Sequence, residues 1–358
     1  MRRCRKAATA GEGLRICYFR RRYSTEIYVK VIIPLAGKGT RLRPHTYVTP
    51  KPLLNVGGKT VMSYILDDLA DLGVSEIIFI TGHLGEKIEE YVGKEYSQFK
   101  THYIKQDNQN GTAGAIWLAK DHIDEDCLII FVDTVFDTDL EMIKQLPEDI
   151  SGVLWAKEVE DYQRFGVLVT DDDGLMTRIV EKPVDPISKL ANIGLYYIKD
   201  WKLLFQGIEK VMEGPTGKTG EYYLTDAFQF MVDHGAKLKV VEVEGWYDCG
   251  EVGTLLETNQ HLLQQGRARE PDGGKGLRVI DPVRVAEGVE LENCEIGPNV
   301  TIETGCVVRD SKLRDCIIGQ DTTIEKSELH NSIIGSNVVV RATRGVLNVG
   351  DNSSVEGG

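Results

Sequence analysis

The feature that most constrains the fold of this chain is a repeat close to its C-terminus. Branched apolar residues recur at intervals of 16 residues in two series, Ile302, Ile318 and Ile334, and Val308, Ile324 and Val340. This spacing is typical of the hexapeptide repeat of a left-handed parallel β-helix, in which small or branched side chains stack inward. We predict such a β-helix at 279–358, with an ordinary β-sandwich as the alternative. Because the repeat is short, we expect its open end to stack on something else.

Ahead of the repeat, residues 29–266 alternate between apolar strands and amphipathic helices. The pattern predicts early strands at 29–35, 76–82, 101–105 and 127–133, with helices at 60–72, 86–96 and 111–123 between them. This alternation is typical of a mainly parallel sheet covered on both faces, with more strands from residue 151 onward. We therefore predict a Rossmann-like α/β domain with a mainly parallel, mixed sheet. The polar, glycine-rich stretch at 267–278 is expected to be a linker.

Composition excludes several classes of protein. The formal net charge of −13 argues against a nucleic-acid binder, and no apolar run reaches the length of about 18 residues that spans a bilayer. The seven cysteines show no CxxC spacing, so we expect free thiols in a reducing cytoplasm. Residues 1–28 are rich in arginine and poor in acid, and we expect a disordered extension or an artefact of start-site choice.

A glycine-rich loop follows the first expected strand and has the properties of a phosphate site. Gly37 and Gly39 allow the backbone to approach a ligand and to point N–H groups at it. Arg41 offers a fork of donors to phosphate oxygens, and Lys51 adds a point charge between two prolines. In such folds the carboxyl edge of the sheet is where ligands bind.

Two common nucleotide-binding motifs do not fit this loop. A Walker A loop requires Ser or Thr after Gly-Lys, where this chain has Gly39, and an earlier Gly, where it has Ile32. A dinucleotide fingerprint requires a third glycine at the position of Leu42. The anion held by the loop therefore belongs to another kind of site.

The stretch LAGKGTRLRPHTYVTPKPLLNVGGK, residues 35–59, resembles the signature of the sugar-1-phosphate nucleotidylyltransferases, or NDP-sugar pyrophosphorylases. The likeness is greatest to the glucose-1-phosphate thymidylyltransferase and uridylyltransferase group, and many members carry a β-helix tail. The resemblance implies catalytic roles for Arg41 and Lys51. It also implies a nucleotide-binding loop made of Leu35, Ala36, Gly37, Gly39 and Thr40. Lys38 departs from the pattern, since many members have glycine there.

Two further segments extend the resemblance to the base and the metal. QDNQNGTAGAI resembles the base-reading segment, in which Gln106 would present a donor and an acceptor to a pyrimidine edge. Gly111 would allow close contact with the base, and Thr112 would join the nucleotide site. Asp133 and the Asp248 of WYDCG resemble the carboxylates that hold Mg²⁺, a cation suited to few protein ligands and substrate phosphates.

A third set of positions resembles the sugar-phosphate site of the family. In VEKP, Glu181 would accept hydrogen bonds from sugar hydroxyls, and Lys182 would hold the sugar phosphate as a third catalytic residue. Weaker matches place four more residues in the sugar pocket: Gly166, Asn192, Tyr196 and Glu221. Asp226 is expected to orient a helix rather than to contact the ligand.

The implied reaction is attack by a sugar 1-phosphate on the α-phosphorus of a nucleoside triphosphate, with release of pyrophosphate. We expect dTTP or UTP and glucose 1-phosphate as substrates, Mg²⁺ as cofactor, a homo-oligomer, and no nucleic-acid or membrane partner. The alternatives are guanylyl transfer to mannose 1-phosphate, adenylyl transfer to glucose 1-phosphate, and a non-catalytic regulatory subunit. Acetyl transfer on the β-helix is disfavoured, because that chemistry usually needs a His base and His330 is the only histidine after residue 261.

Overall fold

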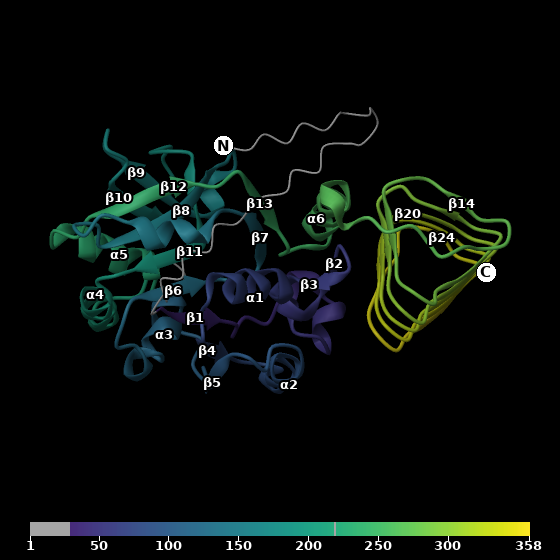
Figure 1. Cartoon of the computed structure of the whole chain (residues 1–358), viewed down its shortest axis with the longest axis horizontal. Coiled ribbons are helices and arrows are strands. Elements are labelled where there is room, and N and C mark those ends of the chain that lie inside the picture. The colour runs from purple at the N-terminus through teal and green to yellow at the C-terminus, as the bar shows by residue number, and fades with distance from the viewer. Residues whose placement is uncertain (1–28, 218–219) are drawn as a thin grey trace, which may run out of the picture.

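The computed structural model describes residues 29–217 and 220–358, so the basic extension at 1–28 lies outside the described residues. An α/β domain is followed by a parallel β-helix, and helix α6 (Val252–Leu262) lies between them (Figure 1). Among the described residues, no helix is both long and apolar enough to cross a membrane. The described cysteines are buried free thiols: Cys127, Cys249, Cys294, Cys306 and Cys316.

The central sheet is mixed, with a parallel half formed by the first strands of the domain. β1 (Lys30–Pro34) pairs in parallel with both β4 (Glu76–Thr81) and β6 (Cys127–Ile130), and β5 (Lys100–Lys105) extends the sheet beyond β4. The other half contains β8 (Gly152–Glu158), β9 (Gly166–Thr170), β10 (Met176–Glu181), β11 (Leu190–Ile198) and β12 (Leu238–Glu242). β11 runs antiparallel to β6 and joins the two halves.

Helices cover both faces of this sheet because successive side chains of a strand point to opposite faces. In β1, Val31 and Ile33 pack into one core cluster, whereas Ile32 packs into the other. The first cluster contains apolar residues of α1 (Val61–Leu72) and α2 (Gly85–Glu95). The second contains residues of α3 (Thr112–Trp117), α4 (Trp201–Glu213) and α5 (Leu224–Asp233). The predicted mixed α/β domain is confirmed, although α3 is shorter than expected and is followed by a separate 3-10 turn at Lys120–His122.

A small hairpin and a separate two-stranded sheet complete the domain near the glycine-rich loop. β2 (Asn55–Val56) pairs with β3 (Lys59–Thr60), directly before α1. β7 (Thr134–Asp137) pairs in antiparallel fashion with β13 (Gly245–Asp248), directly before α6.

The C-terminal strands wind into a triangular parallel β-helix (Figure 1). Its strands are β14 (Arg278–Val279), β15 (Val283–Val285), β16 (Glu290–Glu292), β17 (Glu295–Ile296), β18 (Val300–Ile302), β19 (Val307–Arg309), β20 (Lys312–Ile318), β21 (Thr323–Glu325), β22 (Glu328–Ile334), β23 (Val339–Arg341), β24 (Arg344–Gly345), β25 (Asn348–Val349) and β26 (Ser354–Glu356). The parallel register aligns Ile302 with Ile318 and Ile334, all in the apolar interior. The predicted β-helix is therefore confirmed.

The β-helix docks on the α/β domain through one side, and the stacking that we expected at its open end stays a prediction. Ile317 and Ile333 point outward from β20 and β22 into a cluster that also contains Leu42 and Leu262 of the α/β domain. Buried Asn259 of α6 supports this junction, because its side-chain oxygen accepts hydrogen bonds from Gly57 N and from Thr301 Oγ1.

The interval 267–278, which we expected to be a linker, takes part in the β-helix. Arg269 forms a parallel bridge with Arg284, and Lys275 forms one with Glu292. These residues are held by backbone pairing at the start of the first coil.

Candidate active site

The glycine-rich loop leaves β1 at the carboxyl edge of the sheet, as the sequence predicts. Gly39 adopts a left-handed conformation with φ of 58°, and a Cβ atom on it would lie 3.0 Å from the methyl group of Thr46. The Thr46 hydroxyl donates a hydrogen bond to the carbonyl oxygen of Gly39 at 2.7 Å. Glycine is needed at position 39 for both its backbone conformation and its contacts.

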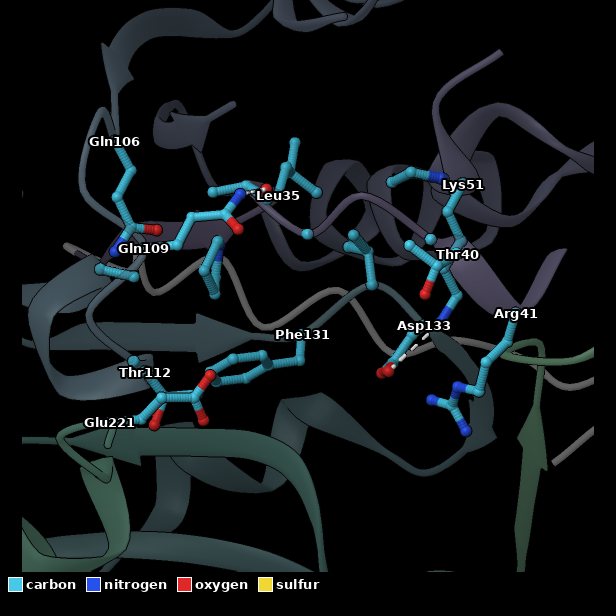
Figure 2. A pocket seen from close by; sticks show the side chains of 18 residues that line it. Leu35, Thr40, Arg41, Lys51, Gln106, Gln109, Thr112, Phe131, Asp133 and Glu221 are labelled. Atoms are coloured by element: carbon cyan, nitrogen blue, oxygen red, sulfur yellow. Dashed lines mark hydrogen bonds and ion pairs between the residues drawn. The ribbon is translucent and has the colours of Figure 1, made fainter. Parts of the chain in front are cut away.

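This loop forms one wall of a cavity of about 400 Å³ (Figure 2). All eight predicted nucleotide-binding residues line it: Leu35, Ala36, Gly37, Gly39, Thr40, Gln106, Gly111 and Thr112. Arg41, Lys51 and Asp133 line the same cavity, at the end away from Gln106. An end that carries amide groups and Glu221 and an end that carries two cations and Asp133 thus lie at opposite sides of the cavity (Figure 2).

At the amide-bearing end, Gln106 is 7% exposed and lies at the end of β5. Its amide nitrogen donates to Asn110 Oδ1 at 3.3 Å. A Cβ atom on Gly111 would lie 2.4 Å from the carbonyl oxygen of Tyr222, so only glycine fits there. Gln109, which we did not predict, lines the cavity and donates to the carbonyl oxygen of Ala36 at 2.6 Å. This bond ties the base-side segment to the glycine-rich loop.

At the charged end, two basic side chains are held by carboxylates. Lys51 Nζ lies 3.3 Å from Asp133 Oδ2, and Arg41 Nη1 lies 2.7 Å from Glu251 Oε1. The backbone of Gly250 lies among these groups. A Cβ atom there would lie 2.7 Å from Asp248 Oδ1, 3.4 Å from Lys51 Nζ and 3.5 Å from Arg41 Nη2. The cationic groups of Lys51 and Arg41 and the carboxylate of Asp248 therefore converge on one point.

The pairing of β7 with β13 brings the two predicted metal ligands together. Asp248 lies opposite Thr134, and Cys249 N donates to the carbonyl oxygen of Asp133 at 2.9 Å. The Thr134 hydroxyl oxygen between them is buried and has no hydrogen-bond partner among the described residues. Asp133 keeps 51% of its side chain exposed, so its oxygens remain accessible to a ligand.

This donor set fits Mg²⁺. Mg²⁺ prefers oxygen ligands, keeps several waters, and is commonly held by one or two carboxylates together with substrate phosphates. Within the part of the chain that the structure describes, no cluster of three or more metal-ligating side chains occurs. The site therefore suits a cation completed by a substrate, not one enclosed by protein.

A second cavity of about 540 Å³ contains the predicted sugar-side residues. They are Gly166, Glu181, Lys182, Asn192, Tyr196 and Glu221, and Asp248 lines the same space. The two cavities share five lining residues: Arg41, Thr112, Phe131, Asp133 and Glu221. Their common boundary thus runs from Arg41 and Asp133 past Phe131 to Thr112 and Glu221.

Hydrogen bonds fix the polar groups of the second cavity. The Thr225 hydroxyl donates to Glu181 Oε2 at 3.3 Å, and the Tyr196 hydroxyl donates to Asn192 Oδ1. Burial raises the pKa of Glu181, although neighbouring Lys182 opposes this shift. Tyr196 is only 4% exposed and packs on Phe228, so it supports Asn192 from the core.

A glycine is also required in the wall of this second cavity, at position 166. A Cβ atom on Gly166 would lie 2.5 Å from Asn192 Nδ2 and 2.9 Å from Glu181 Oε2. Gly166 thus leaves room for the two groups that could receive a polyhydroxylated ligand.

Sequence reasoning missed Glu251 and Arg164 as well as Gln109. Glu251 Oε1 also lies 3.4 Å from Arg164 Nη2, so one carboxylate oxygen contacts two arginines. No local motif reports this, because Arg41 and Glu251 are 210 residues apart in the chain. Gln109 could have been predicted, because it lies within the stretch QDNQNGTAGAI that resembles the base-reading segment.

Comparison with known proteins gives a consistent result. The model of the family described as "Nucleotidyl transferase" matches residues 30–265. The chain is 31% identical over 242 residues to the UTP–glucose-1-phosphate uridylyltransferase AglF of Haloferax volcanii, covering 66% of this chain and 98% of that protein. It is 27% identical over 360 residues to a glucose-1-phosphate thymidylyltransferase of Streptomyces antibioticus, covering 92% of this chain and 99% of that one.

The match to a bifunctional protein GlmU of Methanocaldococcus jannaschii extends into the β-helix. It shows 32% identity over 329 residues, which cover 86% of this chain and 77% of that protein. Among solved structures, a UDP-glucose pyrophosphorylase complexed with UDP-glucose has the same fold, with a TM-score of 0.60, 23% identity, and coverage of 67% of this chain and all of that one. The chain belongs to the nucleotidyl transferase family, and it is an enzyme of the sugar-1-phosphate nucleotidylyltransferase class that its opening loop resembles.

Proposed function

We propose that the protein transfers a nucleotidyl group from dTTP or UTP to glucose 1-phosphate, giving an NDP-glucose and pyrophosphate. One observation carries this proposal: two cavities of different chemistry share a boundary at Arg41 and Asp133. A triphosphate in the first cavity and a sugar phosphate in the second would meet at that boundary. The names of the uridylyltransferase and thymidylyltransferase relatives support the same substrates.

The chemistry asks mainly for positioning and charge stabilisation. The attacking phosphate oxygen is already anionic near neutral pH, so no strong general base is needed. The barrier lies in bringing two anions together and in moving negative charge onto the leaving pyrophosphate. Arg41 and the loop at 37–40 would hold the β- and γ-phosphates, Lys51 would stabilise charge near the α-phosphate, and Lys182 would align the sugar phosphate.

The acidic residues fit the same scheme. Asp133 and Asp248 would hold Mg²⁺, which supplies charge neutralisation for the triphosphate when it is bound. In the absence of substrate, Asp133 and Glu251 neutralise Lys51 and Arg41. Phosphate oxygens would replace these carboxylates as partners of the two cations.

The sugar side fits a hydroxyl-rich ligand. Glu181 and Asn192 present oxygen and amide groups held by neighbours, and buried polar groups of this kind discriminate strongly against ligands that leave them unpaired. On the base side, Gln106 presents an amide, whose donor and acceptor match the polar edge of a pyrimidine. These features support a sugar 1-phosphate and a pyrimidine nucleotide, while the preference for glucose rests on the names of the relatives.

The test is pyrophosphate release with Mg²⁺ for each pair of dTTP, UTP, GTP or ATP with glucose, N-acetylglucosamine or mannose 1-phosphate. We expect the highest kcat/KM for dTTP or UTP with glucose 1-phosphate. Turnover confined to GTP or ATP would overturn the assignment of Gln106. A folded protein that is silent for all pairs would favour the regulatory-subunit alternative.

A further inference from the structure

The segment between Arg41 and Lys51 is held by the last coil of the β-helix. Residues 43–49 connect the two basic side chains but do not line either cavity. His45 is nevertheless only 3% exposed, and Thr46 is buried beside it. The partners that bury and fix this segment come partly from residues about 300 positions later in the chain.

Three polar contacts join the segment to the last coil. His45 Nε2 lies 2.6 Å from Asn348 Oδ1, and Asn348 Nδ2 donates to the carbonyl oxygen of Arg43 at 3.4 Å. The Thr49 hydroxyl donates to Asp351 Oδ2 at 3.2 Å. Gly350 lies so close that a Cβ atom on it would be 3.2 Å from Pro44.

The register of the β-helix shows that Asn348 differs from its equivalents. The parallel pairing aligns Asn348 with Ile333 of β22, and Ile333 with Ile317 of β20. Both isoleucines pack against apolar residues of the α/β domain. In the last coil this position holds an amide, and it faces His45 and a backbone carbonyl group instead. The polar Asn348 side chain thus faces polar groups of the α/β domain, whereas the two isoleucines face apolar ones.

From the segment, contacts continue into the nucleotide cavity. Thr46 donates to the carbonyl oxygen of Gly39, and a Cβ atom on Gly39 would lie 3.3 Å from Cβ of Lys51. Leu42, next to Arg41, packs in the cluster that contains Ile317 and Ile333. The glycine-rich loop is thus fixed by the β-helix on one side. On its other side it adjoins both predicted catalytic cations, Arg41 and Lys51.

We propose that Asn348 and Asp351 are positioning residues of the nucleotide site, and that the β-helix holds the 43–49 segment so that the glycine-rich loop, Arg41 and Lys51 meet the triphosphate. This inference rests on the proposed function for the identity of the ligand. It assigns the β-helix a part in catalysis of nucleotidyl transfer without placing any of its side chains in contact with substrate.

The test compares the full-length wild type with Asn348→Ala, Asn348→Asp and a control, Ser354→Ala. Ser354 is exposed on β26 of the same coil, so its loss measures any general effect on the β-helix. The readouts are hydrogen–deuterium exchange of the amides of 43–49, calorimetric Kd for UTP with Mg²⁺, and KM for each substrate. Asn348→Asp keeps an oxygen for His45, but it replaces the amide donor with a second oxygen and adds a negative charge.

For Asn348→Ala we expect faster exchange at 43–49 and a rise of about tenfold in the Kd and KM for UTP, since small displacements of positioning groups have effects of this size or larger. The KM for glucose 1-phosphate and the exchange of other β-helix strands should stay at wild-type values. Asn348→Asp should recover most of the loss, and Ser354→Ala should behave as wild type.

Unchanged UTP affinity in Asn348→Ala would overturn the inference, whether or not exchange at 43–49 increases. An equal loss in Ser354→Ala would also overturn it, because the effect would then be a general one on the coil. A wild type that binds UTP but releases no pyrophosphate would remove the proposed function while leaving the affinity test valid.

Discussion

The two halves of the active site are built in different ways. The nucleotide half uses a backbone loop and paired charges, with Lys51 next to Asp133 and Arg41 next to Glu251. The sugar half uses partly buried polar groups that are hydrogen-bonded to neighbours, such as Glu181 with Thr225 and Asn192 with Tyr196. We therefore predict that the nucleotide half acts mainly through charge, whereas the sugar half, apart from Lys182, acts mainly through recognition of hydroxyl groups.

The largest effect is expected where the two halves meet. Arg41→Ala should lower kcat on the order of 10²–10³-fold, because it removes a charge clamp on the triphosphate. Arg41 also borders the sugar cavity, so the KM for glucose 1-phosphate shows whether it binds the sugar phosphate as well as the triphosphate. We expect this KM to change less than threefold, a difference of about 0.6 kcal/mol. Steady-state kinetics of pyrophosphate release measure both values, and circular dichroism verifies the fold. An Arg41→Ala enzyme with wild-type kcat would contradict the assignment.

Asp248→Asn should lower turnover on the order of 10²-fold and weaken the dependence on Mg²⁺, since a neutral amide is a poorer ligand than a carboxylate. Titration of activity with Mg²⁺ should show a shift to higher concentration. The matched control is Asp137→Asn, because Asp137 lies in the same two-stranded sheet, opposite Gly245. Equal metal dependence in both variants would mean that Asp248 does not bind the cation.

Glu181→Gln should affect the sugar half alone. We expect a fall of about 10–100-fold in kcat/KM for glucose 1-phosphate, from the loss of a charged acceptor, and little change in the KM for UTP. A rise in both KM values would remove the proposed division between the halves.

The same substitution has a predicted effect on stability. Burial raises the pKa of Glu181, so the folded state binds this proton more tightly than the unfolded chain does. The contribution of Glu181 to stability therefore falls as the pH rises from the unfolded pKa through the raised folded pKa. Glu181→Gln should not lower Tm at pH 7.5, and its advantage over the wild type should shrink at pH 4.5. A lower Tm at pH 7.5 would contradict this ionisation argument.

The smallest effect is expected from Glu251→Gln. Glu251 neutralises Arg41 and Arg164 when no phosphate is present, so the variant should tighten UTP binding by a few-fold with unchanged kcat. An exposed ion pair of this type contributes about 0–1 kcal/mol, which sets the size of the shift. Calorimetry at low and high salt measures it, and a large loss of kcat would instead show that Glu251 takes part in turnover.

Much of this arrangement could be predicted from the sequence because the signals are local. A β-branched strand followed by Gly37 and Gly39 reports both a sheet edge and a ligand loop, and the 16-residue spacing of Ile302, Ile318 and Ile334 reports the β-helix. The residues that the family motif implies could then be located one by one in the chain. All the predicted site residues line one or other of the joined cavities, while their individual roles stay predictions.

What the sequence could not report are contacts between distant segments. The pairing of Arg41 with Glu251 and of His45 with Asn348 depends on how the β-helix and α6 dock, and docking has no periodic signature. The supposed linker also pairs with the first coil, because Lys275 meets Glu292 only after the coil has formed. Oligomeric state and cellular location likewise stay predictions.

The central claim is that both cavities form one reacting site. The most direct test is to incubate the wild-type enzyme with Mg²⁺, UTP and glucose 1-phosphate and to quantify pyrophosphate and UDP-glucose together by chromatography. The account predicts equal amounts of the two products, and neither product when one substrate is omitted. Pyrophosphate without UDP-glucose would mean that the nucleotide is hydrolysed without transfer, and would contradict the joined site.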